Sequence, residues 1–339
     1  MRHIAFPSVE QFRNTVMDIG LRATYIGRAE DNTPLYDENL PKPTLTFKGT
    51  VKLHGTNAGV CFHPGSGLWF QSRESIITLE QDNAGFARWA EANREAFGPL
   101  FAALAEANGI VFGADTVLSL YGEWVGKGIQ AGVGIAEIPK AYFLFGASVS
   151  DGEAEEVWLE TAGLRSVEHR IFHVEDYATY AIAIDFNAPQ AAQAQLAELT
   201  AQVEAECPIA KAHGVLGVGE GIVWTADFLG KRFRFKVKGE KHSVSKVREI
   251  AGIAPEKLAS IEEFVAYALT ENRFQQALSV VFGDPKRADI RRFGEVIKWI
   301  NQDVLKEETD TLEASGLTWK EVNGPIAART RALFFALEV

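Results

Sequence analysis

The chain has 339 residues, of which 47% are hydrophobic, and this length accommodates two domains of ordinary size. Its formal net charge of −11 argues against indiscriminate binding of nucleic acid, so any such contact must use a local basic surface. No run of about eighteen apolar residues occurs, and charges interrupt the first residues, so we expect a cytoplasmic protein without a signal peptide. Its two cysteines, Cys61 and Cys207, lie outside any paired Cys/His spacing, which argues against a zinc site or a disulfide framework.

The N-terminal segment carries a helix-start signal. Ser8 precedes Gln11 by three residues, and this capping-box pattern predicts a short helix that extends to about Ile19. Phe12 and Val16, together with Ile19, would form its buried face. The residues that follow are rich in Pro and Asp and predict a loop that leads into the next strand.

Residues 51–57 have the sequence Val-Lys-Leu-His-Gly-Thr-Asn. Leu53 and Val60 give strand character on both sides, whereas the Gly-Thr-Asn end favours a turn in which the backbone approaches a ligand closely. We therefore interpret Lys52 as a candidate nucleophile that can reach a bound phosphate. Taken alone, the motif favours a hairpin edge that carries a solvated lysine, and the catalytic interpretation depends on the rest of the chain.

Two further predicted strands end in polar residues. The strand at 68–73 ends in Arg73, which is a candidate for a ribose or phosphate contact, with a surface salt bridge as the alternative. Residues 118–130 predict a strand that runs into a glycine-rich turn, and Glu123 at the strand end can accept hydrogen bonds from a sugar hydroxyl, although an isolated glutamate is more commonly a solvated charge. Gln130 follows in the loop.

Scaffold elements surround these polar positions. Residues 84–108 have helical spacing of apolar side chains and predict a core helix, and a second helix is predicted at 189–206. The apolar stretch at 141–146 predicts a buried strand. We assign Phe143 to core packing and Phe145, which precedes a glycine, to a platform for a purine base.

Two neighbouring segments near residue 230 carry charge in unusual places. Glu220 lies between two glycines at the start of an apolar strand, which suggests a metal or water ligand, with a hairpin turn as the alternative. Residues 231–238 alternate strictly, so apolar and cationic side chains fall on opposite faces of a strand. Four cations on one face repel one another unless an anion binds among them, although they also suit an edge strand that prevents aggregation. These cations are Arg232, Arg234, Lys236 and Lys238.

The composition changes from about Ser243 onward. Residues 255–278, 285–306 and 318–336 have helical periodicity and few strand signals. We therefore predict a separate helical domain at the C-terminus.

In this order, the motifs resemble those of the covalent nucleotidyltransferase superfamily of polynucleotide ligases and capping enzymes, and most closely the RNA ligase 2 family. The resemblance rests on K-L-H-G-T-N, G-E-x-x-G-x-G-x-Q and K-V-K. It implies an α+β fold, in which residues 1–242 form an ATP-grasp-like nucleotidyltransferase domain of antiparallel sheets with flanking helices. Residues 243–339 would then form the all-α C-terminal domain.

The resemblance also implies a set of site residues. Lys52 would become covalently adenylylated, with Lys236 and Lys238 as catalytic groups that contact the phosphates. The remaining implied roles are ribose binding by Arg73 and Glu123, adenine stacking by Phe145, divalent-metal binding by Glu220, and further active-site positions for His54, Asn57 and Gln130.

The implied cofactors are ATP and magnesium or manganese, and the implied partner is RNA with 5′-phosphate and 3′-hydroxyl ends in a nicked duplex. We expect a monomer without membrane contact. A free lysine has a pKa of roughly 10.4, so Lys52 must lose its proton before it attacks phosphorus, and we expect Lys236 and Lys238 to favour that loss. AMP would then pass to the RNA 5′-phosphate, and a 3′-hydroxyl would expel AMP and seal the phosphodiester.

Two alternatives remain open. A capping-type guanylyltransferase or a DNA ligase shares the same core, but such enzymes usually carry an OB-fold where this chain predicts helices. A non-catalytic protein that binds RNA ends or nucleotides belongs to a different class, and in such a protein the loss of Lys52 would leave nucleotide binding nearly unchanged.

Overall fold

The computed structural model describes residues 1–152, 156–239, 260–282 and 288–337. The chain forms two compact units, each built from separate stretches of sequence. The first unit comprises Met1–Ser8, Leu53–Thr179 and Glu206–Gly219, and the second comprises Val9–Lys52, Tyr180–Ala205 and Glu220–Val339. The predicted boundary between residues 242 and 243 lies outside the described residues, so it stays a prediction.

The first unit is organised around a seven-stranded sheet with the order β10-β9-β8-β5-β6-β7, and β11 also pairs with β9. All neighbouring strands are antiparallel except β11 and β9, which are parallel. The strand bounds are β5 (Thr56–His63), β6 (Gly67–Ser72), β7 (Ile76–Ile77), β8 (Thr116–Val125), β9 (Ala141–Asp151), β10 (Val157–Leu159) and β11 (Ile171–His173).

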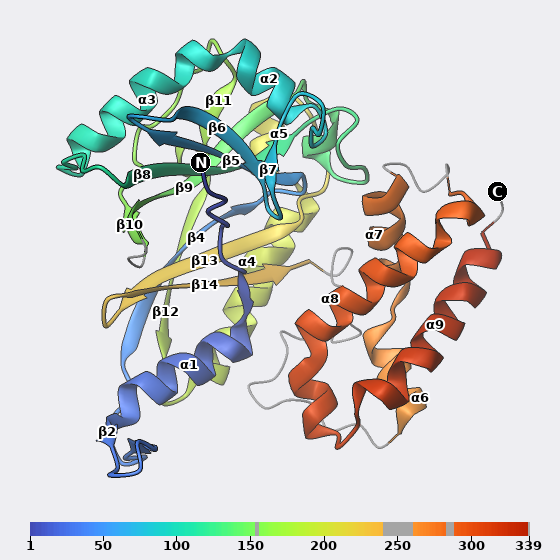
Figure 1. The fold of residues 1–339 in the computed structure, drawn as a ribbon. Coiled ribbons are helices and arrows are strands. Elements are labelled where there is room, and N and C mark those ends of the chain that lie inside the picture. The colour runs from blue at the N-terminus through green and yellow to red at the C-terminus, as the bar shows by residue number, and fades with distance from the viewer. Residues whose placement is uncertain (153–155, 240–259, 283–287, 338–339) are drawn as a thin grey trace. The chain divides into compact units, whose positions relative to one another are not determined.

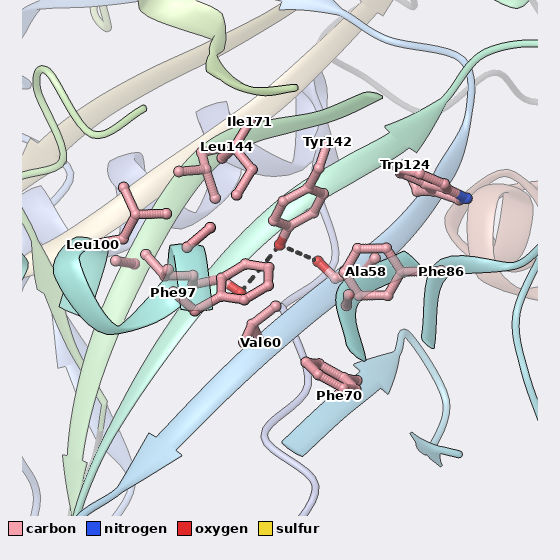
Figure 2. Close-up of a cluster of buried hydrophobic side chains, with 14 of the residues drawn as sticks. Ala58, Val60, Phe70, Phe86, Phe97, Leu100, Trp124, Tyr142, Leu144 and Ile171 are labelled. Atoms are coloured by element: carbon pink, nitrogen blue, oxygen red, sulfur yellow. Dashed lines mark hydrogen bonds between the residues drawn. The ribbon is translucent and has the colours of Figure 1, made fainter. Parts of the chain in front are cut away.

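Two helices, α2 (Phe86–Ala92) and α3 (Arg94–Ala107), pack on one face of this sheet and form its main core (Figure 1). The predicted continuous helix is divided at Asn93, whose backbone is not helical and caps both segments. Figure 2 shows the core, in which the Tyr142 hydroxyl donates to the backbone carbonyls of Ala58 and Leu120. The unit also contains η1 (Gly134–Glu137), η2 (Val174–Asp176) and α5 (Pro208–Ala212).

The second unit contains a five-stranded sheet with the order β1-β14-β13-β4-β12. Along β14, Phe233, Phe235 and Val237 are buried, as the alternating pattern predicts, so the cations occupy the opposite face. The unit also contains a hairpin formed by β2 (Tyr25–Arg28) and β3 (Pro34–Tyr36). The strand bounds of the sheet are β1 (Glu10–Gln11), β4 (Thr44–Lys52), β12 (Thr179–Asp185), β13 (Gly221–Phe228) and β14 (Lys231–Lys238).

Helix α1 (Phe12–Thr24) buries Phe12, Val16 and Ile19, as predicted, but it does not begin with a capping box. Gln11 is the N-cap residue and makes no capping hydrogen bond. Its backbone is extended because β1 pairs with β14, so its side chain is available for a tertiary contact. The helical segment after β12 consists of η3 (Pro189–Ala192) and α4 (Gln193–Ala205).

The described C-terminal residues are helical, and their apolar faces form a separate hydrophobic core. This observation, together with the antiparallel sheets, confirms the predicted α+β class with a helical C-terminal part. Within the described residues, no helix combines the length and apolar character needed to cross a membrane. The elements are α6 (Ile261–Ala268), α7 (Glu271–Phe282), η5 (Ile290–Arg292), α8 (Phe293–Ala314) and α9 (Trp319–Phe335), coloured orange to red in Figure 1.

Phe86 provides a test of the first unit's core. Phe86 is the first residue of α2, and its ring is fully buried in the core between that helix and the sheet residues, so Phe86→Ala should lower the free energy of unfolding by about 3–5 kcal/mol. Urea unfolding followed by tryptophan fluorescence measures this change. Val111→Ala is the control, because Val111 is 88% exposed and its truncation should change stability by less than about 0.5 kcal/mol. Equal effects of the two substitutions would contradict the assignment of Phe86 to the core.

Candidate active site

Three charged side chains meet at the ends of adjacent strands in the second unit. Lys52 is the last residue of β4, Lys238 is the last residue of β14, and Glu220 immediately precedes β13. Gly221 pairs in register with both lysines, because β13 lies between β4 and β14. The Glu220 carboxylate accepts a hydrogen bond from Lys52 Nζ at 2.7 Å, and its other oxygen lies 3.2 Å from Lys238 Nζ.

This cluster is largely shielded from solvent. The Glu220 side chain is 2% exposed, against 22% for Lys52 and 15% for Lys238. A buried carboxylate requires such partners, because an unpaired charge in a low dielectric is strongly unfavourable. Burial alone would lower the pKa of Lys238, but the nearby carboxylates, Glu220 foremost, outweigh it and raise that pKa above its ordinary value.

Glycine at position 221 is required by the backbone. Gly221 has φ +150°, and a Cβ there would clash with the carbonyl of Val237 and the backbone of Lys238. The absence of a side chain lets β13 and β14 approach each other beside the cluster. Glu220 is therefore a buried, ion-paired residue and not part of a solvated hairpin turn, while its proposed role as a metal ligand stays a prediction.

Lys236 lies on the same strand face as Lys238 but has a different partner. Its Nζ is 2.7 Å from Oε1 of Glu307, on α8, and the Glu307 side chain is 9% exposed. Burial acts to raise the pKa of Glu307, but Lys236, Gln11 and Lys238 together outweigh it and lower that pKa to about 2. Carboxylates therefore contact both lysines that are predicted to bind phosphate.

The cationic face of β14 does not act as a single uniform patch. Arg232 forms a two-pronged ion pair with Asp227 on β13, at 2.9 Å for each hydrogen bond. A bidentate pair of this kind satisfies the guanidinium locally. At the other end of this face, Lys236 contacts Glu307 of α8 and Lys238 contacts Glu220.

In the first unit, the lysine motif and the glycine-rich motif meet at Gly55. Its N–H donates to Glu123 Oε1 at 3.0 Å, and its carbonyl accepts from Gln130 Nε2 at 3.2 Å. Asn57 pairs in register with Glu123, so it lies on the same sheet face, and His54 is half-buried beside Gly55 in the chain. Oε1 of Gln130 is buried and has no hydrogen-bond partner within the described part of the chain, so it can accept a hydrogen bond from a ligand.

Arg73 and Phe145 contact the N-terminal residues. The Arg73 side chain is 45% exposed and donates a hydrogen bond to Ser8 Oγ at 3.0 Å. The Phe145 ring is half-buried and packs edge-to-face on Phe6 at 4.8 Å between ring centroids. Phe143, by contrast, is fully buried and lies opposite Glu123 in register. The roles of Arg73 and Phe145 in ribose and base binding stay predictions.

A divalent cation is compatible with the donor atoms at the cluster. Among the described residues, no group of three or more His, Cys, Asp or Glu side chains is arranged to hold a metal on its own. Magnesium commonly binds through one or two carboxylates and completes its shell with water and substrate phosphates. Glu220 supplies a carboxylate at the cluster, but both of its oxygens contact lysine Nζ atoms, so its role as the protein ligand of such a cation stays a prediction.

Sequence reasoning missed Glu307, although a local signal was present. The buried stripe of α8 runs through Val296, Ile300 and Val304, and helical spacing places residues 307 and 308 next on the same face. A charge at a position that the pattern makes buried requires a partner of opposite sign. The pattern thus indicates that a partner is needed, but it does not identify the partner as Lys236.

One comparison with known proteins identifies a family. A family model described as RNA ligase matches residues 46–238. Among solved structures, the chain is similar to the RNA ligase of Naegleria gruberi with pyrophosphate, at 18% identity and a TM-score of 0.40, with 70% of this chain and 56% of that chain covered. A mutant of that ligase with AMP and Mn has 17% identity, a TM-score of 0.40 and the same coverage. The chain thus spans about half the length of these structures, and a comparison with curated proteins found no match.

The lowered pKa of Glu307 predicts a pH effect on stability. Because this pKa lies below the ordinary value of 4.5, the ionised carboxylate stabilises the fold above about pH 4.5, and this contribution is lost as the pH falls towards about 2. The difference in unfolding free energy between wild type and Glu307→Gln should therefore be constant near neutral pH and shrink below about pH 4. Denaturant unfolding at several pH values measures this difference.

The matched control is Glu313→Gln, because Glu313 lies on the same helix and is exposed. This variant should differ little from wild type at any pH. A Glu307→Gln difference that does not change with pH would show that the carboxylate has an ordinary pKa.

Proposed function

The chain belongs to the RNA ligase family, and on this premise we propose that it is an ATP-dependent RNA ligase that forms a covalent lysyl-AMP on Lys52. The observation that carries the proposal is the contact of Lys52 and Lys238 with one buried carboxylate, Glu220. A nucleophilic lysine needs nearby cations that bind the leaving phosphates, and it needs a group that influences the charge of its amine. Lys238 would act as such a cation, and Glu220 would influence the charge of the Lys52 amine.

In the first step, Lys52 Nζ attacks the α-phosphorus of ATP, the bond to the β-phosphate breaks and pyrophosphate leaves. The amine must be neutral to attack. The Glu220 carboxylate accepts a hydrogen bond from Lys52 Nζ, and we propose that the positive charge of Lys236 and Lys238 favours the loss of the Lys52 proton when ATP is bound. Lys236 and Lys238 would also stabilise the charge that develops on the departing pyrophosphate.

Glu220 would be the protein ligand of magnesium or manganese, which supplies charge neutralisation to the triphosphate when bound. In the first unit, Glu123 and Gln130 would orient the backbone at Gly55 through their hydrogen bonds to it. We further propose that Arg73 and Glu123 bind the ribose and that Phe145 stacks on adenine. His54 and Asn57 would line the same nucleotide site.

In the later steps, an oxygen of the RNA 5′-phosphate attacks the AMP phosphorus and Lys52 leaves as the amine. The 3′-hydroxyl of the neighbouring strand then attacks the 5′-phosphorus and AMP departs, so a phosphodiester forms. The substrate we propose is RNA with 5′-phosphate and 3′-hydroxyl ends in a nicked duplex. Lys236 and Lys238, at the end of β14, would supply positive charge for such a contact once phosphates approach them.

Lys52 provides the direct test. With α-labelled ATP and magnesium, wild-type protein should retain label in a denaturing gel, and Lys52→Ala should lose all of it because no phosphoramide can form. Lys48→Ala is the matched control, since Lys48 lies on the same strand β4 but is exposed and four residues away, and it should label as wild type does. Absence of a Lys52-dependent label would falsify the covalent mechanism. Label from GTP alone would favour a capping-type guanylyltransferase instead.

The substrate class is tested separately. We expect joining of 5′-phosphorylated RNA at a nick, with less joining of single-stranded RNA and of DNA, when the products are resolved by gel electrophoresis. Joining restricted to DNA ends would identify a DNA ligase. Reversible ATP binding that Lys52→Ala leaves unchanged, without any joining, would identify a non-catalytic binding protein.

A further inference from the structure

We propose that Glu307 of α8 is a positioning residue for nucleotidyl transfer, which holds Lys236 in place for phosphate binding and makes the C-terminal helical segment part of the active site. The inference rests on the proposed function, because it assigns Lys236 to the phosphates of ATP. It also goes beyond that function, since it assigns a catalytic contribution to a helix that lies outside the matched region of residues 46–238.

The Glu307 carboxylate contacts two side chains, those of Lys236 and Gln11. Glu307 Oε1 is 2.7 Å from Lys236 Nζ, and Glu307 Oε2 accepts a hydrogen bond from Gln11 Nε2 at 3.0 Å. Gln11 Nε2 also donates to the backbone carbonyl of Glu307 at 3.0 Å. Gln11 is itself the register partner of Lys236 in the pairing of β1 with β14. The carboxylate is therefore fixed from the strand that lies next to the lysine it holds.

Buried guanidinium groups anchor this part of α8. Arg13, which is 1% exposed, donates to the carbonyl of Glu307 at 3.0 Å and to Asp310 on the same helix. Arg273, which is fully buried, donates to Asp303 at 2.8 Å and to Glu308 at 3.0 Å. Because buried ion pairs are lost only at high cost, the backbone of α8 at Glu307 is held in place.

Lys236 needs such a partner because of its neighbours. Arg234 and Lys238 lie two residues away on either side, on the same strand face, and like charges at that spacing repel. A lysine side chain is long and flexible, so without Glu307 this repulsion would favour orientations away from the strand end. An ammonium has three N–H donors, so the hydrogen bond to Glu307 leaves two that can meet phosphate oxygens.

The test measures formation of lysyl-AMP by the full chain at a series of ATP concentrations. Glu307→Gln should raise the KM for ATP by about tenfold, because the charge-assisted bond that holds Lys236 becomes a weak neutral one. Glu313→Gln removes the same charge from an exposed position of α8 and should leave KM unchanged. Glu307→Asp keeps the charge and should recover part of the loss.

A double-mutant cycle separates positioning from a general effect on the fold. In a Lys236→Met background, Glu307→Gln should have no further effect, because Glu307 acts through the Lys236 ammonium. If Glu307→Gln does not fold, Gln11→Leu replaces it, since it removes the hydrogen bond to Oε2 and should raise KM in the same direction by a smaller factor.

Three results would overturn the proposal while wild-type protein still forms its Lys52-dependent label. These are an unchanged KM in Glu307→Gln, an equal effect of that substitution in the Lys236→Met background, and a lowered KM. The last result would mean that Glu307 competes with phosphate for Lys236. Failure of wild-type protein to form the label would instead reject the proposed function itself.

Discussion

The burial of one carboxylate between two ammonium groups is the constraint on which the second unit's polar face depends. Glu220 is 2% exposed, so it is stable only if cations reach it from the neighbouring strands. The register of β4, β13 and β14 meets this requirement, because Lys52 and Lys238 both lie opposite Gly221. A shift of one residue in either pairing would turn one lysine to the other face and leave the carboxylate without its partner.

The pairing of buried charges also connects helix α8 to β14 and α1. Arg13 of α1 is buried and contacts acidic residues of α8, and Lys236 of β14 contacts Glu307 on the same helix. Apolar packing holds the C-terminal helices to one another, whereas these ion pairs and hydrogen bonds are specific in direction. Electrostatic contacts thus define how α8 meets β14, and they bring a helix distant in sequence to a lysine at the proposed phosphate site.

The proposed chemistry needs an amine whose charge can change. The ion pair with Glu220 directs the Lys52 ammonium at one oxygen of a buried carboxylate. The first unit contributes hydrogen bonds to the backbone that follows Lys52. There, Gly55 is hydrogen-bonded at both its N–H and its carbonyl, so the turn after Lys52 has a defined backbone conformation.

The sequence by itself determined the features that depend on local pattern. Strict alternation over residues 231–238 determined the strand and its two faces, because side chains alternate along any strand. The order of short motifs was sufficient to indicate the family, and helical periodicity was sufficient to indicate the C-terminal helices. These features arise from neighbours in the chain, and they need no knowledge of how distant segments meet.

Only the tertiary structure decided which charges pair. Lys52 and Glu220 are 168 residues apart, and no local pattern relates them. Gln11 has the spacing of a helix cap, but pairing of β1 with β14 keeps its backbone extended and directs its side chain to Glu307. The physical reason is that a buried charge specifies that it needs a partner of opposite sign, whereas the fold alone specifies which distant residue reaches it.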